Sequence, residues 1–190
     1  MEFLNKTAIK LDKEINELDR FVFKFLKVLE KHTDYVIVSG YVAIILGRNR
    51  GTDDVDIIIP RMELNKFTLL YDSLLKNKFW CLNSSNTNDL YGLLTSRHSI
   101  RFAIEPEVSP NVELKFSKDI YDGIALKNPI KILINNKVLH TSFLELQIAY
   151  KEEVLKSNKD LEDAKHLRDI AKNYLNNELI TEYKKKLREK

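Results

Sequence analysis

The feature that most constrains the fold is the stretch YVIVSGYVAIILGRNRGTDDVDIIIP, residues 35 to 60. The apolar residues 35 to 38 predict a strand, and the pair Ser39-Gly40 predicts a tight turn. A two-turn helix and a polar loop then lead to a second apolar run, 55 to 59, which Pro60 ends. Such a run indicates a strand buried on both faces, and we expect the two strands to lie side by side.

Two aspartates stand at the start of that second strand. Asp54 and Asp56 are two residues apart, so their side chains project from the same face. Carboxylates held this close repel each other and are costly to desolvate, and a divalent cation removes both problems. Oxygen-only ligation favours Mg²⁺ or Mn²⁺ over zinc. The alternative for an isolated pair is an acidic loop end surrounded only by solvent.

The turn before the short helix has the chemistry of a phosphate site. The helix from Tyr41 to Leu46 begins with free backbone N–H groups, which bind anions. Gly40 has no side chain to keep a phosphate away from the backbone. A nucleoside triphosphate (NTP) needs such donors together with a metal ion, and the stretch from residue 39 to 56 offers both.

This stretch resembles the signature of the nucleotidyltransferase superfamily related to DNA polymerase beta, and it is closest to the AbiEii-like and minimal nucleotidyltransferase branches. The positions in register with the signature are Gly40, Gly47, Arg50, Thr52, Asp54 and Asp56. One departure is Ser39-Gly40, where the usual pair is Gly-Gly or Gly-Ser. The resemblance implies an α+β nucleotidyltransferase fold with a mixed β-sheet core, flanking helices and a helical C-terminal part. It also implies Ser39, Gly40, Arg50 and Thr52 as nucleotide-binding residues.

Members of the superfamily usually supply a third acid from a later strand, as a metal ligand and often as a base. The candidate is Glu113 in the strand pattern NVELKF, where Glu113 and Lys115 share one face. Glu113 would complete the site with Asp54 and Asp56 if its strand neighbours theirs. The alternative is an ordinary exposed strand glutamate.

The segment QIAYKEEVLKSNKDLEDAKHL resembles the C-terminal motif of AbiEii-like transferases. In that family a helical lysine lies toward the nucleotide phosphates and an aspartate helps to position it. The resemblance assigns these roles to Lys151 and Asp160, with Asp163 as an open alternative to Asp160. On charge alone, the segment also suits a capped surface helix.

Composition narrows the class of protein. The chain has 190 residues, a net charge of +3 and one cysteine, Cys81, so it suits one ordinary domain in a reducing cytoplasm without a disulfide framework. No apolar run approaches the length of a membrane span. Arg48 and Arg97 are expected to be solvated surface charges, and Cys81 is expected in the core.

The remaining pattern predicts three parts along the chain. Residues 1 to 33 are expected to form a helix, with its apolar spacing from Leu11 to Leu29, that packs on a core of residues 34 to 140. Residues 83 to 89 are expected to be a flexible loop, and residues 130 to 140 a hairpin. Residues 141 to 190 are expected to be helical, with Ser142 and Glu145 as a capping box.

These features favour a metal-dependent enzyme that transfers NMP from an NTP such as ATP to an acceptor hydroxyl. The AbiEii resemblance implies an RNA acceptor such as a tRNA 3′ end, a toxin-like role and an antitoxin partner. A protein or small-molecule hydroxyl suits the residues equally. The alternatives are a catalytically inactive relative that binds a nucleotide or partner, and a nucleic-acid-binding module that uses the lysine-rich C-terminus.

Overall fold

The computed structural model describes residues 1–189, which divide into two compact units that alternate along the chain. Unit 1 contains Met1–Lys13, Val38–Arg50 and the segment that begins at Asn128, and unit 2 contains Glu14–Ile37 and Gly51–Lys127. The sequence predicted three consecutive parts along the chain, whereas each compact unit of the structure combines segments that are distant in sequence. Within the described residues, no helix combines the length and the apolar character that a bilayer span requires.

Unit 2 contains a mixed sheet with the strand order β3-β4-β7-β6-β5. The strands are β3 (Val36–Ile37), β4 (Asp54–Ile59), β5 (Phe79–Cys81), β6 (Ile100–Ile104) and β7 (Asn111–Phe116). Strand β4 runs parallel to β7 and antiparallel to β3, and the other neighbours are antiparallel. The prediction that the two strands of the opening stretch lie side by side is therefore confirmed.

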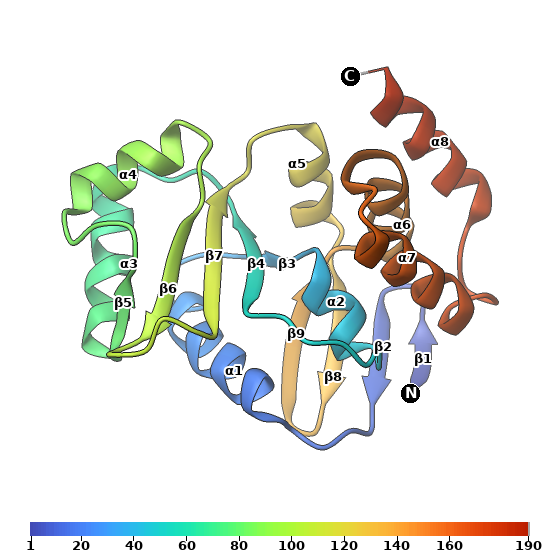
Figure 1. Ribbon diagram of the computed structural model, residues 1–190, viewed down its shortest axis with the longest axis horizontal. Coiled ribbons are helices and arrows are strands. Elements are labelled where there is room, and N and C mark those ends of the chain that lie inside the picture. Colours follow the sequence, from blue (N-terminus) through green and yellow to red (C-terminus); the bar gives the residue numbers. More distant parts are fainter. Residues whose placement is uncertain (190) are drawn as a thin grey trace. The chain divides into compact units, whose positions relative to one another are not determined.

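Four helices belong to unit 2 (Figure 1): α1 (Glu17–Leu29), α3 (Leu64–Lys76), α4 (Thr87–Thr95) and α5 (Ile120–Lys127). Helix α3 contacts α1, α4 and β5. Aromatic rings fill the space between helices and sheet, since Phe25 of α1 meets Phe79 edge-on with ring centroids 5.2 Å apart. Cys81 is buried, as predicted. The apolar residues Val55, Ile57, Val112 and Leu114 of β4 and β7 are buried in the same unit.

Unit 1 contains the strands β1 (Glu2–Asn5), β2 (Ala8–Leu11), β8 (Ile130–Ile134) and β9 (Lys137–Thr141), in the order β1-β2-β8-β9. Strand β2 is parallel to β8, while β1 with β2 and β8 with β9 form antiparallel hairpins. The hairpin predicted at residues 130 to 140 is thus confirmed.

Unit 1 also contains most of the C-terminal part of the chain (Figure 1). Its helices are α2 (Gly40–Ile45), α6 (Leu144–Tyr150), α7 (Asn158–Ile170) and α8 (Asn177–Arg188), and the π-helical segment η1 (Lys151–Leu155) continues α6. Helix α6 packs against α7 and α8, and α2 packs against α7. The predicted helical C-terminal part is therefore present.

The prediction for the N-terminus was wrong at its start. Leu11 belongs to β2, where it pairs with Ile134, and the helix α1 begins only at Glu17. Asn16 caps that helix, because its side chain accepts a hydrogen bond from the Asp19 backbone N–H at 2.8 Å. The helical spacing of Leu11 was a coincidence, and its pairing partner lies more than a hundred residues away.

Two further local predictions were wrong. Residues 83 to 89 are not a loop throughout, because α4 begins at Thr87, where the Asn86 side chain caps the helix. Ser142 does not form a capping box, because α6 begins at Leu144 without a side-chain cap. Instead the Glu145 carboxylate accepts a hydrogen bond from the Asn176 backbone N–H at 3.0 Å. A tertiary contact therefore uses the group that the local motif would have used.

Candidate active site

Two of the predicted acids lie next to each other on adjacent strands of unit 2. The parallel register of β4 and β7 pairs Asp56 with Glu113. Side chains of register partners lie on the same face of a sheet, and Asp54 shares that face because it is two residues from Asp56. The sheet therefore presents Asp54, Asp56 and Glu113 on one face, and Glu113 does lie on a strand that neighbours the aspartates.

Hydroxyl groups orient two of these carboxylates. The Thr52 hydroxyl donates a hydrogen bond to Asp54 Oδ1 at 2.7 Å. The Ser99 hydroxyl donates a longer hydrogen bond to Glu113 Oε2 at 3.3 Å. Thr52 was predicted to bind nucleotide, and in the structure it holds Asp54. Ser99 was not predicted, and only its proximity to Glu113 in the fold identifies it.

The third carboxylate, that of Asp56, forms an ion pair with a lysine. Lys115 Nζ lies 3.1 Å from Asp56 Oδ1 and donates a hydrogen bond to it. Burial lowers the pKa of Lys115, but the Asp56 charge and hydrogen bond outweigh burial and raise the pKa above its ordinary value. The sequence indicated that Lys115 shares a face with Glu113, but only the strand register shows that it reaches Asp56.

The donor chemistry of this face fits Mg²⁺, since every candidate ligand atom is an oxygen. A further oxygen, Asn111 Oδ1, lies on the strand position opposite Asp54 and is buried without a hydrogen-bond partner. Within residues 1–189, however, no three acidic, histidine or cysteine side chains are gathered closely enough to hold a metal ion. The ligand types are thus in place, while the carboxylates are not drawn together around one point.

The predicted turn at Ser39-Gly40 lies in unit 1. Ser39 has a positive φ of 64°, and its backbone N–H donates a hydrogen bond to the Gln147 Oε1 of α6 at 3.2 Å. The Ser39 hydroxyl makes no capping hydrogen bond to α2. Gln147 is buried, so a side chain from the protein interior, which the sequence pattern did not identify, holds the turn.

Arg50 packs directly against the glycine of this turn. A Cβ atom at Gly40 would lie 2.1 Å from Arg50 Nη2, so any larger residue would displace the guanidinium. Asp163 holds Arg50 in place, because its two oxygens accept hydrogen bonds from Nε at 3.1 Å and Nη2 at 3.0 Å. In this chain, the missing side chain of Gly40 leaves the space that the Arg50 guanidinium fills.

Lys151 approaches the same aspartate from η1. Its Nζ lies 2.8 Å from Asp163 Oδ2 and 3.1 Å from Asp160 Oδ1, and the side chain is only 1% exposed. Arg48 also donates a hydrogen bond to Asp163. Burial raises the pKa of Asp163, but hydrogen bonds from Arg50 and Lys151 outweigh burial and lower the pKa below its ordinary value.

The structure brings both candidate aspartates of the C-terminal motif to Lys151. Asp163 is fully buried and joins Lys151 to Arg50, whereas Asp160 is partly exposed and also accepts a hydrogen bond from Ser157. The prediction of Arg48 as a solvated charge was wrong, because its side chain is 14% exposed and pairs with Asp163. The feature of the sequence that could have indicated this pairing is the group of acidic residues in α7, of which Glu162 and Asp163 contact Arg48.

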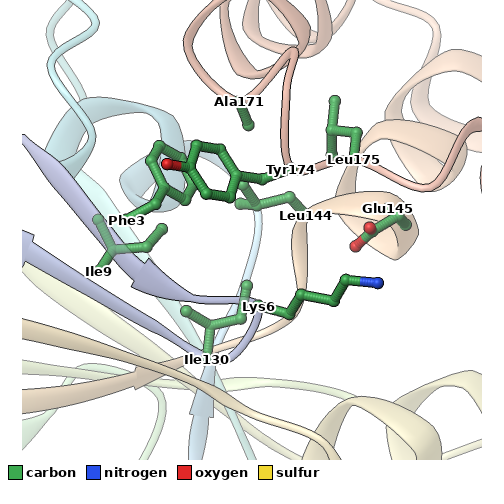
Figure 2. A pocket seen from close by; sticks show the side chains of 9 residues that line it. All are labelled: Phe3, Lys6, Ile9, Ile130, Leu144, Glu145, Ala171, Tyr174 and Leu175. Atoms are coloured by element: carbon green, nitrogen blue, oxygen red, sulfur yellow. The ribbon is translucent and has the colours of Figure 1, made fainter.

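The predicted residues therefore form two groups, one in each unit, and neither group lines the small pocket of unit 1 shown in Figure 2. In that pocket Phe3 stacks on Tyr174, with ring centroids 4.3 Å apart and an interplanar angle of 11°. Its volume of about 20 Å³ corresponds to about one water molecule. The contact ties the N-terminal hairpin to the C-terminal segment, and we assign it a structural role.

Comparison with known proteins gives matches at the level of structure. No protein family matches the sequence, and no curated protein matches it either. The antibiotic-resistance factor ANT(2'')-Ia, in its solution structure, matches with a TM-score of 0.53 at 14% identity, over 90% of each chain. A crystal structure of ANT(2'')-Ia in complex with adenylyl-2''-tobramycin matches with a TM-score of 0.54 at 14% identity, over 90% of this chain and 96% of that one.

A third match is a crystal structure from another organism. An antigenic nucleotidyltransferase-like protein from Paracoccidioides brasiliensis matches with a TM-score of 0.52 at 18% identity, over 88% of this chain and 85% of that one. Identities this low show a common fold and nothing finer. Together with the mixed sheets and the C-terminal helices, these matches show that the chain has an α+β nucleotidyltransferase fold.

Proposed function

We propose that this protein transfers a nucleoside monophosphate from an NTP to an acceptor hydroxyl with the help of Mg²⁺ or Mn²⁺. The observation that carries the proposal is the acidic face of unit 2, where the β4–β7 register pairs Asp56 with Glu113 and Asp54 shares their side. Such a face, in a chain with a nucleotidyltransferase fold, has the ligand chemistry of a divalent-cation site.

Arg50 and the Ser39-Gly40 turn are proposed to bind the triphosphate. Arg50 is a planar donor whose orientation is set by Asp163, so part of the entropic cost of ordering it is already met before ligand binds. Lys151 is almost completely buried, so we propose that it acts behind Arg50 by holding Asp163 rather than by contacting phosphate itself. Asp160 has the same supporting role from the other side of Lys151.

In the proposed reaction, the acceptor oxygen attacks the α-phosphorus and forms a new P–O bond. The bond between the α-phosphorus and the bridging oxygen breaks, and pyrophosphate leaves with that oxygen. Glu113 accepts the proton of the acceptor hydroxyl, and Arg50 stabilises the charge on the phosphates. Mg²⁺ bound by Asp54, Asp56 and Glu113 would supply charge neutralisation at the phosphate oxygens.

Two kinds of similarity suggest which molecule accepts the NMP: the sequence motif and the structural match. The resemblance to AbiEii-like enzymes supports an RNA such as a tRNA 3′ end, together with a toxin-like role controlled by an antitoxin protein. The structural match to ANT(2'')-Ia in complex with adenylyl-2''-tobramycin supports testing aminoglycoside hydroxyls as well. RNA is our first choice, because the motif resemblance extends to the C-terminal Lys151 and Asp160.

A second candidate function is nucleotide or partner binding without transfer. The ion pair between Lys115 and Asp56 favours it, because a lysine already neutralises one of the carboxylates that the reaction would use. An inactive relative would still bind nucleotide through Arg50, whereas an enzyme would release pyrophosphate. The two functions therefore differ in a product that can be measured.

The deciding experiment incubates the protein with each NTP, Mg²⁺ and a panel of RNA, protein and aminoglycoside acceptors, followed by mass spectrometry. We expect an acceptor to gain the mass of one NMP, and the Asp54→Ala variant to lose at least about a hundredfold in rate, because it removes a metal ligand. Asp72→Ala, on α3, serves as the control for loss of a negative charge. Nucleotide binding without any NMP transfer would instead support the inactive relative.

A further inference from the structure

Among the residues that the structure describes, Lys115 pairs with Asp56, one of the predicted metal-binding carboxylates. It lies on β7, two residues after Glu113, and reaches diagonally to the neighbouring strand, where its Nζ is 3.1 Å from Asp56 Oδ1. The two side chains are 24% and 19% exposed, so both are largely shielded from water. An ion pair so shielded is much stronger than one on an open surface.

The position of this ammonium group determines how a divalent cation can bind. A cation that took Asp56 as a ligand would bind either the Oδ1 atom that Lys115 contacts or the Oδ2 atom of the same carboxylate, and in both cases it would lie close to the ammonium group. Two positive groups cannot share one carboxylate closely without repulsion. Lys115 must therefore move away from Asp56, or the cation binds weakly.

We propose that Lys115 is a built-in counter-ion for Asp56 that a divalent cation displaces when it binds. This proposal rests on the proposed function, since it concerns the same carboxylates. In the free protein, Lys115 neutralises Asp56 and keeps the face stable without metal. Metal binding is consequently weak until a triphosphate, which brings its own negative charge, offers the ammonium group a new partner and the metal more ligands.

The positive charge of the displaced Lys115 also indicates which group it would bind next. An ammonium group released from a carboxylate that binds Mg²⁺ is a ready donor to a phosphate oxygen of a nucleotide that the metal ion carries. Lys115 thereby links the two binding events: metal and nucleotide each favour the arrangement in which Lys115 has left Asp56. Coupling of this kind is reciprocal, so nucleotide raises the affinity for metal and metal raises the affinity for nucleotide.

The test measures Mn²⁺ binding to the nucleotide-free protein by isothermal titration calorimetry. We expect Lys115→Met to bind Mn²⁺ at least about tenfold more tightly than the wild type, because one positive charge next to the metal ligand is gone. Lys115→Arg keeps the charge and should bind no more tightly than the wild type. Lys131→Met, which removes an exposed strand lysine of β8, controls for the change in net charge.

Thermal melting provides a second measurement that does not depend on transfer. Without metal, Lys115→Met should melt at a lower temperature than the wild type, because Asp56 and Glu113 lose their neutralising partner. Mn²⁺ should raise its melting temperature by more than it raises that of the wild type. Equal Mn²⁺ affinities and equal Mn²⁺-induced shifts in both proteins would overturn the proposal, and so would absence of Mn²⁺ binding in Lys115→Met.

The outcomes separate this proposal from the proposed function. If the Mn²⁺ affinities differ as expected but no acceptor gains NMP, Lys115 is a displaceable counter-ion in a protein that does not transfer nucleotides. If NMP transfer occurs while the affinities of wild type and Lys115→Met agree within twofold, the function stands and the role of Lys115 is overturned.

Discussion

Asp163 shows how strongly one residue can determine the state of its neighbours. It has no exposed surface, and it accepts hydrogen bonds from Arg48, Arg50 and Lys151. A buried carboxylate with partners of opposite charge avoids most of its desolvation penalty, but the three cations depend on it in the same way. Any substitution at this position therefore affects four charges rather than one.

We predict that Asp163→Asn lowers the free energy of unfolding by about 3 to 5 kcal/mol, since it removes the buried negative charge to which Arg48, Arg50 and Lys151 all donate. Urea denaturation followed by circular dichroism measures the change. Asp169→Asn is the matched control, because Asp169 is an exposed residue of the same helix, α7. A loss below about 1 kcal/mol at Asp163 would mean that the remaining carboxylates, Glu162 and Asp160, neutralise Arg48 and Lys151 sufficiently.

The residues of the candidate site differ in how far the sequence identifies them. Asp54 and Asp56 follow from period-two spacing in one strand, whereas Glu113 was expected from the family resemblance, with the same spacing rule giving only its face of the strand. The spacing rule also gives the face on which Lys115 lies. Its contact with Asp56, however, depends on the parallel register of β4 and β7, in which Asp56 pairs with Glu113, 57 residues further along the chain. Nothing in the sequence around Gln147 indicates that its side chain supports the Ser39-Gly40 turn, because that contact joins residues that are distant in the chain.

At the scale of elements, α8 is attached to η1 by ion pairs. Lys184 of α8 lies 2.9 Å from Glu152 and 3.2 Å from Glu153, and Arg188 donates two hydrogen bonds to Glu153. The hydrogen bond from Arg188 lowers the pKa of Glu153 to about 2, even though burial acts in the opposite direction. The position of α8 should therefore respond to acid.

The sign of this pH dependence follows from the lowered pKa. Because the folded state holds Glu153 ionised below its ordinary pKa of 4.5, its stabilisation is complete above pH 4.5 and is lost as the pH falls toward 2. We predict that Glu153→Gln melts at a lower temperature than the wild type at pH 6, and that the difference shrinks as the pH falls to about 2.

Circular dichroism melts over that pH range test the prediction. Glu182→Gln is the matched control, because Glu182 pairs only with Lys186 on the exposed side of α8 among the pairs described. A difference between Glu153→Gln and the wild type that stays constant with pH would show that the carboxylate charge is not what attaches the helix.

Elements whose signal is local were predicted well. The apolar run of β4, the alternation of β7, and the hairpin around Asn135, which adopts a positive φ of 52°, all follow from neighbouring residues. The strand β2 was missed because its stability comes from pairing with β8, and only Ile9 and Leu11 face the core. A four-residue strand has too few residues for its own pattern to prevail over an overlapping helical one.

At the scale of the whole molecule, the chain passes between the two units four times. The first three passages fall after Lys13, Ile37 and Arg50, so the stretch from residue 35 to 60 contributes residues to both units. No single cut can therefore separate the units, and a fragment defined by chain order does not correspond to either of them.

We predict that a chain ending after Leu155 keeps the fold of unit 2 and loses that of unit 1. The deletion removes Asp163 and the buried apolar residues of α7 and α8, which leaves Lys151 and Arg50 without their main partner. Hydrogen exchange with mass spectrometry should show protected amides in β4 and β7 and unprotected amides in β2 and β8. Equal loss of protection in both units would contradict this.

The pairing of β2 with β8 also has a consequence for biosynthesis. The ribosome releases Leu11 long before Ile130, and at about 5 to 20 residues per second the interval is roughly ten seconds. By then the nascent chain contains every strand of unit 2, while the N-terminal hairpin still lacks its neighbour. An unpaired strand edge of this kind is a template for pairing with another chain, and it stays open until Ile130–Ile134 emerge.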